Sequence, residues 1–399
     1  MSVSIDQLED LVERSDKLIT GLKKKIFTPT GAKQFNKLFK ISEAARLIDR
    51  HPQTIREAEK QGHIKVERAE GTNARDFTLE QLNAARKHFG SEPRLGRDEE
   101  AAVLAVQNFK GGVGKSTISV HLAQWLAIQG YRVLLIDLDS QASSTSLFGY
   151  TPDIDIDPDD TLLPFFEGQQ RTMHYAIRDT QIENLSLIPA NLSLYSAEYL
   201  VASKHNSSPI YSHLPRGIQD LKKDYEVIIL DPPPALGMLS INALVAATSI
   251  LVPMPPRMLD FTSSLQFFSM LHETLESIEE DLGRSIEYDF VKIVASKKKQ
   301  RLGDEKYARA EDDILEIARD MAFGDEYMLK NVIYESSAID NAANQFKSLY
   351  EVDGKDARTK SFRSALNSMN LVCEEVEQEL LKLWPSMQGK LKQTAAEIA

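Results

Sequence analysis

The sequence has little of what secreted and membrane proteins need. Its 399 residues include one cysteine, Cys373, so no disulfide can form within the chain and no thiolate cluster can hold zinc or an iron–sulfur centre. No apolar run approaches the roughly 20 residues that a bilayer span requires. The polar N-terminus has no apolar segment behind a basic one. These absences predict a cytoplasmic protein that is neither secreted nor membrane-spanning.

Charge is unevenly distributed along the chain, whose net charge is −12. Residues 1–97 contain 19 Lys and Arg against 14 Asp and Glu, a net of +5, which leaves −17 for the remainder. Such asymmetry predicts a basic module attached to an acidic one. Between them, residues 91–100 (SEPRLGRDEE) combine a proline, a glycine and four consecutive charges, and we expect a linker there.

Residues 4–27 predict one long amphipathic helix. Its apolar side chains recur at steps of three and four residues. They are Ile5, Leu8, Val12, Ile19, Leu22 and Ile26. Because little neighbouring sequence can cover this stripe, one interpretation is a partner helix from a second copy of the chain, and the other is docking on its own domain. We assign residues 1–40 as a dimerisation segment.

Residues 41–64 predict two short helices around a tight connection. Pro52 starts the second helix at a position that favours proline, and Gly62 ends it. An alternating hairpin with a turn at residues 71–73 and another helix over 78–89 should follow. This pattern resembles winged helix-turn-helix DNA-binding domains, which we assign to residues 41–97. On the outer face of the second helix, the side chains able to reach base edges and phosphates are Gln53, Thr54, Arg56 and Lys60. A helical hairpin that touches only protein is the alternative.

From residue 98 onward, short apolar runs alternate with helical stretches. The runs are VLAVQN, RVLLIDLD, LSLIPA, YEVIILD, SILVPMP and YDFVKIVAS. Nearly continuous apolar strands of this kind are covered on both faces. We therefore predict an α/β domain over residues 98–399, with a mostly parallel twisted sheet, helices on both faces and a ligand beyond the carboxyl ends of the strands.

A glycine-rich loop, KGGVGKST, follows the first of these strands and opens the helix TISVHLAQWLAIQG. Its three glycines allow backbone N–H groups to face phosphate oxygens, at a helix N-terminus that carries partial positive charge. Lys115 should reach the β and γ phosphates, and the Ser116 hydroxyl can bind Mg²⁺. The predicted nucleotide-binding residues are Lys110, Gly111, Gly112, Val113, Gly114, Lys115, Ser116 and Thr117.

This loop departs from the ordinary phosphate-loop pattern at two places. Phe109 stands where the first glycine is expected. Lys110 is a second lysine in the loop, although a phosphate cradle needs only one. Lys110 either takes part in nucleotide binding or is a solvated side chain of the loop.

Two strand ends supply carboxylates next to this loop. YEVIILDPPP ends in Asp231, the expected place for an acid that holds Mg²⁺ through water. VLLIDLDSQASST contains Asp137 and Asp139, from which a carboxylate could orient an attacking water. A single acid at a strand end is usually a cap or a turn residue, but two such ends beside a phosphate loop favour a nucleotide-hydrolysing centre.

With KGGVGKST, LLIDLDSQASST and VIILDPPP in place, residues 100–350 resemble the deviant P-loop ATPases of the ParA/MinD group. The N-terminal helix and helix-turn-helix resemble those of the larger partition ATPases of low-copy plasmids and plasmid prophages. The resemblance implies a Mg²⁺-dependent ATPase that binds ATP and ADP. It implies that Lys110 reaches the nucleotide of the partner subunit in a sandwich dimer, that Asp139 positions water, and that Asp231 is the acid of the second strand.

The resemblance also implies partners. We expect an ATP-bound homodimer that binds chromosomal DNA without sequence preference, and a ParB-type centromere-binding protein that stimulates hydrolysis. With ADP or no nucleotide, the chain should bind operator DNA and repress its own genes. Two basic clusters could hold chromosomal DNA or be solvated loops: Lys297, Lys298, Lys299 and Arg301 in the first, and Arg358, Lys360 and Arg363 in the second. Such a protein would be cytoplasmic and nucleoid-associated.

Other functions remain to be compared. A membrane-positioning relative would need a basic amphipathic C-terminal anchor, whereas Cys373 is followed by three glutamates within four residues and Pro385 interrupts the apolar stripe. We expect a docking helix there and no membrane partner. A repressor that uses nucleotide only as an effector, without a motor role, is the alternative function.

Overall fold

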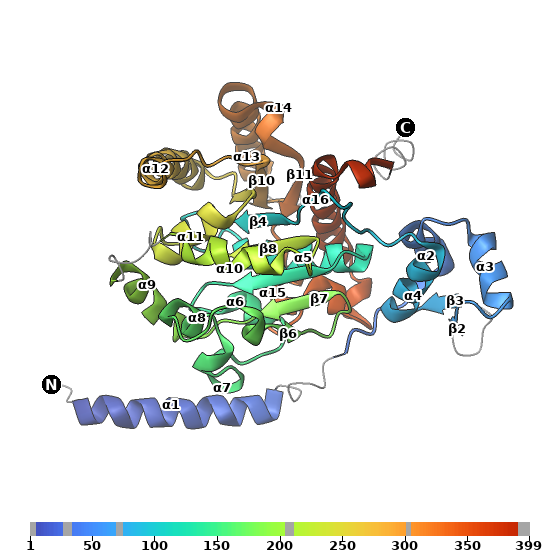
Figure 1. The fold of residues 1–399 in the computed structure, drawn as a ribbon, viewed down its shortest axis with the longest axis horizontal. Helices are drawn as coiled ribbons and strands as arrows, with labels where there is room; N and C mark the ends of the chain where they lie inside the picture. Colours follow the sequence, from blue (N-terminus) through green and yellow to red (C-terminus); the bar gives the residue numbers. More distant parts are fainter. Residues whose placement is uncertain (1–4, 27–33, 69–74, 204–210, 301–304, 390–399) are drawn as a thin grey trace. The chain divides into compact units, whose positions relative to one another are not determined.

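The computed structural model describes residues 5–26, 34–68, 75–203, 211–300 and 305–389 (Figure 1). It divides into two compact units, Met1–Phe35 and Asn36–Ala399. In the first unit, α1 (Ile5–Ile26) is the long helix that the apolar repeat predicted. Its exposed apolar side chains include Ile5, Leu8 and Val12, at 83%, 53% and 60%.

The second unit begins with a small group of helices and strands over residues 39–89, here called the module. Its helices are α2 (Ile41–Ile48), α3 (Pro52–Lys60) and α4 (Leu79–Phe89). Its strands are β1 (Phe39–Lys40), β2 (Glu67–Arg68) and β3 (Arg75–Phe77), which form an antiparallel sheet in the order β1-β3-β2. Phe39, Ile55 and Phe77 are fully buried in the core of the module. The predicted turn at residues 71–73 lies outside the described residues.

Local sequence explains where the helices of this module begin. The ring of His51 accepts the backbone N–H of Gln53 at 3.2 Å, and Pro52 occupies the first helical position of α3. Thr78 and Gln81 form a reciprocal capping box at the start of α4. The helix-connection-helix segment predicted from residues 41–64 is therefore present.

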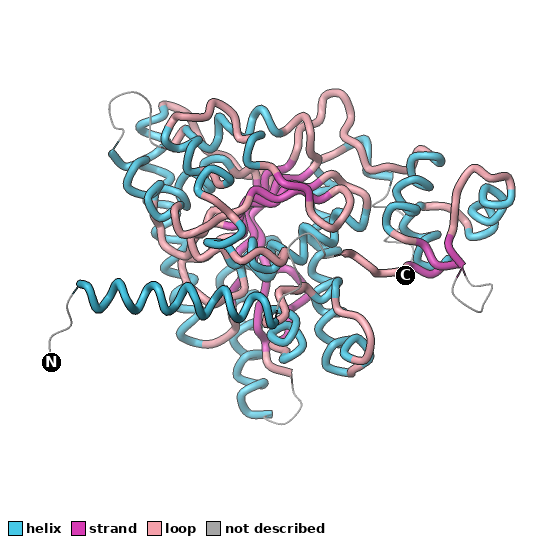
Figure 2. Tube along the Cα trace, turned by 90° about the horizontal axis from the view of Figure 1, so that it is seen from below, coloured by secondary structure: helices cyan, strands magenta, loops and turns pink. Residues whose placement is uncertain are grey.

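A mostly parallel sheet of eight strands forms the centre of the remaining chain (Figure 2). Its order is β11-β10-β9-β4-β8-β5-β7-β6, and only the β6–β7 pair is antiparallel among the described pairings. The strands are β4 (Ala102–Val106), β5 (Val133–Asp137), β6 (Arg178–Asp179), β7 (Leu185–Ile188), β8 (Val227–Asp231), β9 (Ser249–Met254), β10 (Phe290–Lys298) and β11 (Met328–Tyr334).

Helices cover both faces of this sheet, as the apolar strands require. One face of β4, β5 and β8 packs against α8 (Leu163–Glu167), α9 (Leu194–Ser203), α10 (His213–Leu221) and α11 (Met238–Ala246). The other face packs against α5 (Lys115–Gln129), and α16 (Lys360–Leu383) packs against α5 and β11. The remaining α-helices are α6 (Ser143–Leu147), α7 (Pro152–Asp155), α12 (Met258–Leu282), α13 (Glu305–Ile317), α14 (Gly324–Tyr327) and α15 (Ser337–Ala343).

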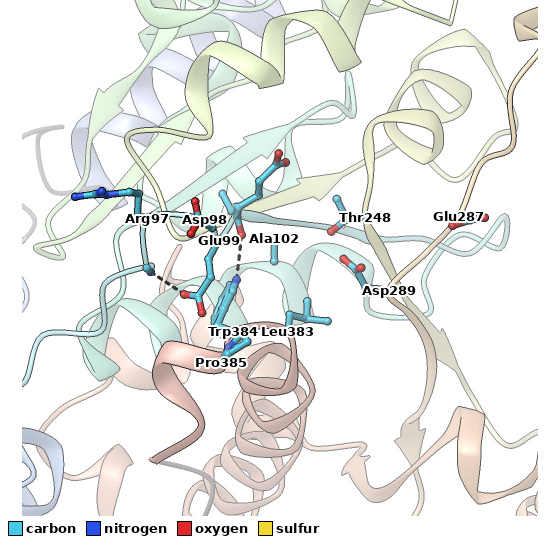
Figure 3. Close-up of a pocket in the computed structure, with 13 residues that line it drawn as sticks. Arg97, Asp98, Glu99, Ala102, Thr248, Glu287, Asp289, Leu383, Trp384 and Pro385 are labelled. Carbon is cyan, nitrogen blue, oxygen red and sulfur yellow. Dashed lines mark hydrogen bonds between the residues drawn. The ribbon is translucent and has the colours of Figure 1, made fainter.

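Part of residues 91–100, the segment expected to be a linker, is fixed to the region that forms the eight-stranded sheet, here called the sheet domain. The indole N–H of Trp384, just after α16, donates to the carbonyl of Glu100 at 3.0 Å. The carboxylate of Glu99 accepts the backbone N–H of Gly96 at 2.7 Å (Figure 3). It also accepts the backbone N–H of Ser386 at 2.7 Å. Residues 96–100 and 383–385 line one side of a cavity of about 700 Å³, with Thr248, Glu287 and Asp289 on the other. Because Thr248 and Asp289 precede β9 and β10, this cavity lies at the amino ends of the strands.

None of the helices in the described ranges combines the length and the apolar character needed to cross a membrane. The helix expected near the C-terminus is α16, whose apolar side chains, among them Met369, Val372 and Val376, are buried. Residues 390–399 lie outside the described part of the chain.

Candidate nucleotide site and nucleic-acid surfaces

The loop between β4 and α5 has the backbone of a phosphate cradle. Gly112 and Gly114 have positive φ angles of 74° and 99°, in the left-handed region that favours glycine. A Cβ atom placed at Gly111 or Gly112 would meet no atom within 4 Å, so this side of the loop is open. Asn108 is buried and accepts the N–H of Lys110 at 3.1 Å, which fixes the first turn of the loop.

Phe109 explains the first departure from the ordinary pattern. Its ring meets that of Phe267 of α12 edge-on, with centroids 4.5 Å apart. The side chain packs against the apolar cluster between α12, β9 and β10. Phe109 therefore anchors the loop to α12, which a glycine at this position could not do.

Lys115 is buried at the start of α5, only 7% exposed. Its ammonium contacts the backbone carbonyl of Lys110 at 3.4 Å. Burial lowers the pKa of Lys115, while the nearby charges of Asp231 and Asp139 act in the opposite direction. The lysine therefore lies where a phosphate would replace the solvation that it has lost.

The carboxyl ends of β5 and β8 lie in register, with Asp137 opposite Asp231. Both side chains are fully buried. Asp231 accepts the Ser144 hydroxyl at 2.7 Å and the Ser119 hydroxyl at 3.3 Å. Burial raises the pKa of Asp231 to about 6, although hydrogen bonds from Ser144 and Ser116 and the charge of Lys115 oppose the shift.

Asp137 has a different set of partners. Its carboxylate accepts the N–H and the hydroxyl of Thr145 at 2.8 and 2.7 Å, and the N–H of Asp139 at 3.1 Å. Burial, with the charge of Asp231 as a further cause, raises the pKa of Asp137 well above its usual range. Asp137 thus holds the turn that carries Asp139, whose own carboxylate accepts the N–H of Gln141 at 3.0 Å.

The donor set fits a magnesium nucleotide. Ser116 and Asp231 are in hydrogen-bond contact and offer hydroxyl and carboxylate oxygens, the ligand type that Mg²⁺ prefers. Two buried acids at adjacent strand ends also need positive charge beside them. The structure thus brings together Lys115, Ser116, Asp139 and Asp231, which the sequence assigned to one site.

The second lysine of the loop is paired within its own chain. The ammonium of Lys110 forms an ion pair and hydrogen bond with the carboxylate of Asp260, in the first turn of α12. The Asp260 side chain is 11% exposed, whereas the Lys110 side chain is 37% exposed. Sequence reasoning missed Asp260, although an acid in the first turn of a helix that follows a strand end was a visible signal.

The four side chains predicted to contact operator DNA are all exposed on α3. Ile55 and Ala58 on the opposite face are buried against α2. Arg75 of β3 binds the carboxylate of Glu59 at 2.5 Å, which ties the small sheet to α3. The helix thus presents Gln53, Thr54, Arg56 and Lys60 to solvent, and their binding role stays a prediction.

The two basic clusters lie next to each other, because the Gln300 amide donates to the Ser364 hydroxyl of α16 at 2.8 Å. Their lysines are not equivalent. Lys298 is 7% exposed and its ammonium binds Asp312 at 2.8 Å. Lys297 and Lys299 are partly exposed, whereas Arg358, Lys360 and Arg363 are exposed at the start of α16. Arg301 lies outside the described residues.

Known proteins share this architecture. Residues 101–288 match the model of a family described as an AAA domain. The chain is 35% identical to the protein SopA of Escherichia coli K12 over 367 residues, 88% of this chain and 90% of SopA. A solved structure of a partition protein covers 93% of this chain and 98% of its own length, with a TM-score of 0.63 at 20% identity.

A further solved structure, which contains a bound nucleotide, resembles the part of this chain that forms the eight-stranded sheet. Cobyrinic acid a,c-diamide synthase from Mycobacterium smegmatis, with an ATP analogue and magnesium, is 27% identical with a TM-score of 0.50, over 63% of this chain and 93% of its own. The fold and the phosphate loop define an ATPase fold of the ParA/MinD type. The chain belongs to the SopA/ParA-type family of plasmid partition proteins.

Proposed function

We propose that this chain is a Mg²⁺-dependent partition ATPase that hydrolyses ATP to ADP and phosphate. The observation that carries this proposal is the meeting of Lys115, Ser116, Asp139 and Asp231 around one open phosphate loop. ATP with Mg²⁺ would supply the phosphoryl group and the metal charge. Lys115 would bind the β and γ phosphates, Ser116 and Asp231 would hold the metal directly or through water, and Asp139 would orient the attacking water.

Lys110 would act between subunits. In this proposal it leaves Asp260 and binds the nucleotide of a second copy of the chain, so that ATP bridges a homodimer and hydrolysis separates it. Charge-assisted contacts to phosphate are strong enough to bias an interface between two states. The exposed stripe of α1 would provide a further contact between copies, helix against helix.

DNA would be bound in two ways. With ADP or without nucleotide, the module over residues 41–97 acts as a winged helix-turn-helix, holds operator DNA through α3 and represses the partition genes. With ATP, the dimer binds chromosomal DNA without sequence preference. The adjacency of the two basic clusters supports a phosphate-binding surface formed by Lys297, Lys299, Arg358, Lys360 and Arg363.

The cycle would be completed by a ParB-type centromere-binding protein. This partner would stimulate hydrolysis and release the dimer from DNA, and so separate plasmid copies in a cytoplasmic, nucleoid-associated process. The sequence similarity to SopA over most of both chains supports this assignment.

The test compares two DNA fragments of equal length, one from the promoter upstream of the gene and one of random sequence, with ADP and with ATP. We expect promoter preference with ADP and sequence-independent binding with ATP. Promoter preference under both nucleotides, with no ATP-dependent binding to random DNA, would instead establish a nucleotide-responsive repressor without a motor role.

A further inference from the structure

Arg86 of α4 connects the N-terminal module to the sheet domain through a buried guanidinium. Arg86 is 1% exposed. It donates to the carbonyl of Leu47 in α2 at 3.0 Å and to the carbonyl of Ile128 in α5 at 2.5 Å. It also donates to the side chain of Asn83 at 2.5 Å. One charged group therefore binds three helices, two of the module and the helix that follows the phosphate loop.

The fit around this guanidinium is close. A Cβ atom at Gly130 would lie 3.1 Å from the Arg86 side chain, and Gly130 has a positive φ of 103°. A larger residue there would have to displace the arginine. Burial lowers the pKa of Arg86 to about 10, so the guanidinium is still charged at neutral pH and depends on its carbonyl partners.

Arg94 in the connecting segment binds the same end of α5. Its guanidinium donates to the carbonyl of Gly130 at 3.1 Å and lies 3.5 Å from the buried carboxylate of Glu226. The last carbonyls of a helix have no partner within the helix and carry partial negative charge. In this chain Arg86 and Arg94 donate hydrogen bonds to the carbonyls at the end of α5.

The opposite end of α5 begins at the phosphate loop, with Lys115 as its first residue. At 1.5 Å per residue, the 15 residues of α5 form a rod of about 22 Å. His121 stiffens the first turns, because one ring nitrogen contacts the carbonyl of Thr117 at 2.7 Å and the other accepts the N–H of Leu349 at 3.0 Å. A shift of the phosphate end must therefore move the end that the two arginines hold.

We propose that Arg86 and Arg94 are positioning residues that couple the nucleotide state of the phosphate loop to the DNA affinity of the N-terminal module. The coupling runs along α5 as a rigid element. It rests on the proposed function, since it requires that ADP and ATP give different promoter affinities. Each nucleotide would set a different position of the α5 C-terminus, and the arginines would pass that position to α2 and α4.

The experiment measures the affinity of the full chain for a labelled promoter fragment by fluorescence anisotropy, with ADP and with a non-hydrolysable ATP analogue. The first variant is Arg86→Lys, because a lysine cannot make the several hydrogen bonds of the guanidinium. The second is Arg94→Gln, at a position where the native arginine side chain is partly exposed. The matched control is Arg50→Gln. Arg50 also donates to a helix-end carbonyl, that of Phe89 at 2.8 Å, but only within the module.

In the wild type we expect the two nucleotides to change promoter affinity by about tenfold, a usual size for coupling between sites. In both variants the ratio should fall to within about twofold of unity, while the control keeps the wild-type ratio. A purely structural role would lower the thermal midpoint and both affinities but leave the ratio unchanged, and that result would overturn the coupling. If the wild type itself shows no nucleotide dependence, the proposed switch between DNA-binding modes is refuted, and the coupling with it.

Discussion

Lys110 and Asp260 lie 150 positions apart in the sequence, yet they form an ion pair beside the phosphate loop. The pairing holds the second lysine of the loop against α12 of its own subunit. For Lys110 to bind a nucleotide in another subunit, this contact must first be broken. In the proposed dimer the pair would therefore oppose association until phosphate competes for the ammonium.

Replacing Asp260 with asparagine should favour the ATP-bound dimer. A hydrogen bond to a charged group contributes roughly 1.5 kcal/mol or more, which corresponds to about a tenfold change in an equilibrium constant. We expect Asp260→Asn to dimerise at about tenfold lower ATP concentration, measured by light scattering or sedimentation. The double variant Lys110→Ala with Asp260→Asn is the control and should not dimerise with ATP. If the single variant dimerises no more readily than wild type, the pair has no such role.

The role of Asp139 can be separated from nucleotide binding. We expect Asp139→Ala to bind a fluorescent ATP analogue as the wild type does, because Asp139 is only partly buried and Asp137 holds its turn. Steady-state ATP hydrolysis should fall by roughly 10²- to 10⁴-fold, the usual contribution of a positioned acid or base. Hydrolysis at the wild-type rate would show that another group orients the water.

The buried carboxyl of Asp231 predicts a pH dependence of stability. Its pKa is about 6 in the folded chain against about 3.9 in an unfolded one. Between these values the folded state binds more protons, so Asp231 makes the folded state progressively less stable as pH rises from about 4 to about 6. Above that range the full penalty is present, and below it the penalty disappears.

Asp231→Asn should remove this penalty in the nucleotide-free protein. We expect the variant to have a higher thermal midpoint than wild type at pH 7.5, and the difference to shrink as pH falls below about 5. Scanning calorimetry at several pH values measures it, with Asp139→Asn as the control at a partly exposed acid. A variant that is less stable than wild type at pH 7.5 would contradict the assigned shift.

The two basic clusters should contribute unequally to sequence-independent DNA binding. Lys360→Gln and Arg363→Gln should each lower the slope of log affinity against log salt by about 1, because both residues are exposed. Lys298→Gln should leave the slope unchanged, since Asp312 already neutralises that buried ammonium. Binding to random DNA with ATP, titrated with salt, is the measurement. Equal effects from all three variants would refute this distinction.

Operator recognition should depend on the exposed face of α3. We expect the double variant Thr54→Ala with Arg56→Ala to lose about tenfold or more in promoter affinity with ADP, because each good base contact contributes roughly 1 to 3 kcal/mol. Binding to random DNA with ATP should be retained. Lys87→Ala, an exposed cation on α4, is the control. Unchanged operator affinity in the double variant would reject the assignment of α3.

The apolar runs predicted the sheet because their pattern is local. The strands β5, β7, β8 and β9 fall within the predicted runs, β4 and β10 overlap theirs, and α5 follows the glycine loop as expected. By contrast β11, Met328–Tyr334, was not predicted. Its sequence MLKNVIY places a lysine and an asparagine in the middle of a short apolar run.

The site was predictable where one motif contained it and not where distant segments meet. Lys115 and Ser116 lie in one loop, whereas the partner of Lys110 depends on how α12 packs. Lys298 looked like part of a solvated basic run, but it is the last residue of β10 and is buried. Arg86 gave a detectable signal, because it shares a helix face with the buried Leu82 of α4.

The contact between Trp384 and Glu100 joins positions that a ribosome makes 284 residues apart. Residues 36–89 contain their own buried core and emerge early, and small units of this kind fold as they are synthesised. The contacts of Glu99 and Glu100 with the residues after α16 cannot form until Trp384 and Ser386 have been added. A nascent chain can therefore form the contacts of Arg86 and Arg94 with the end of α5 long before the connecting segment closes against the residues that follow α16.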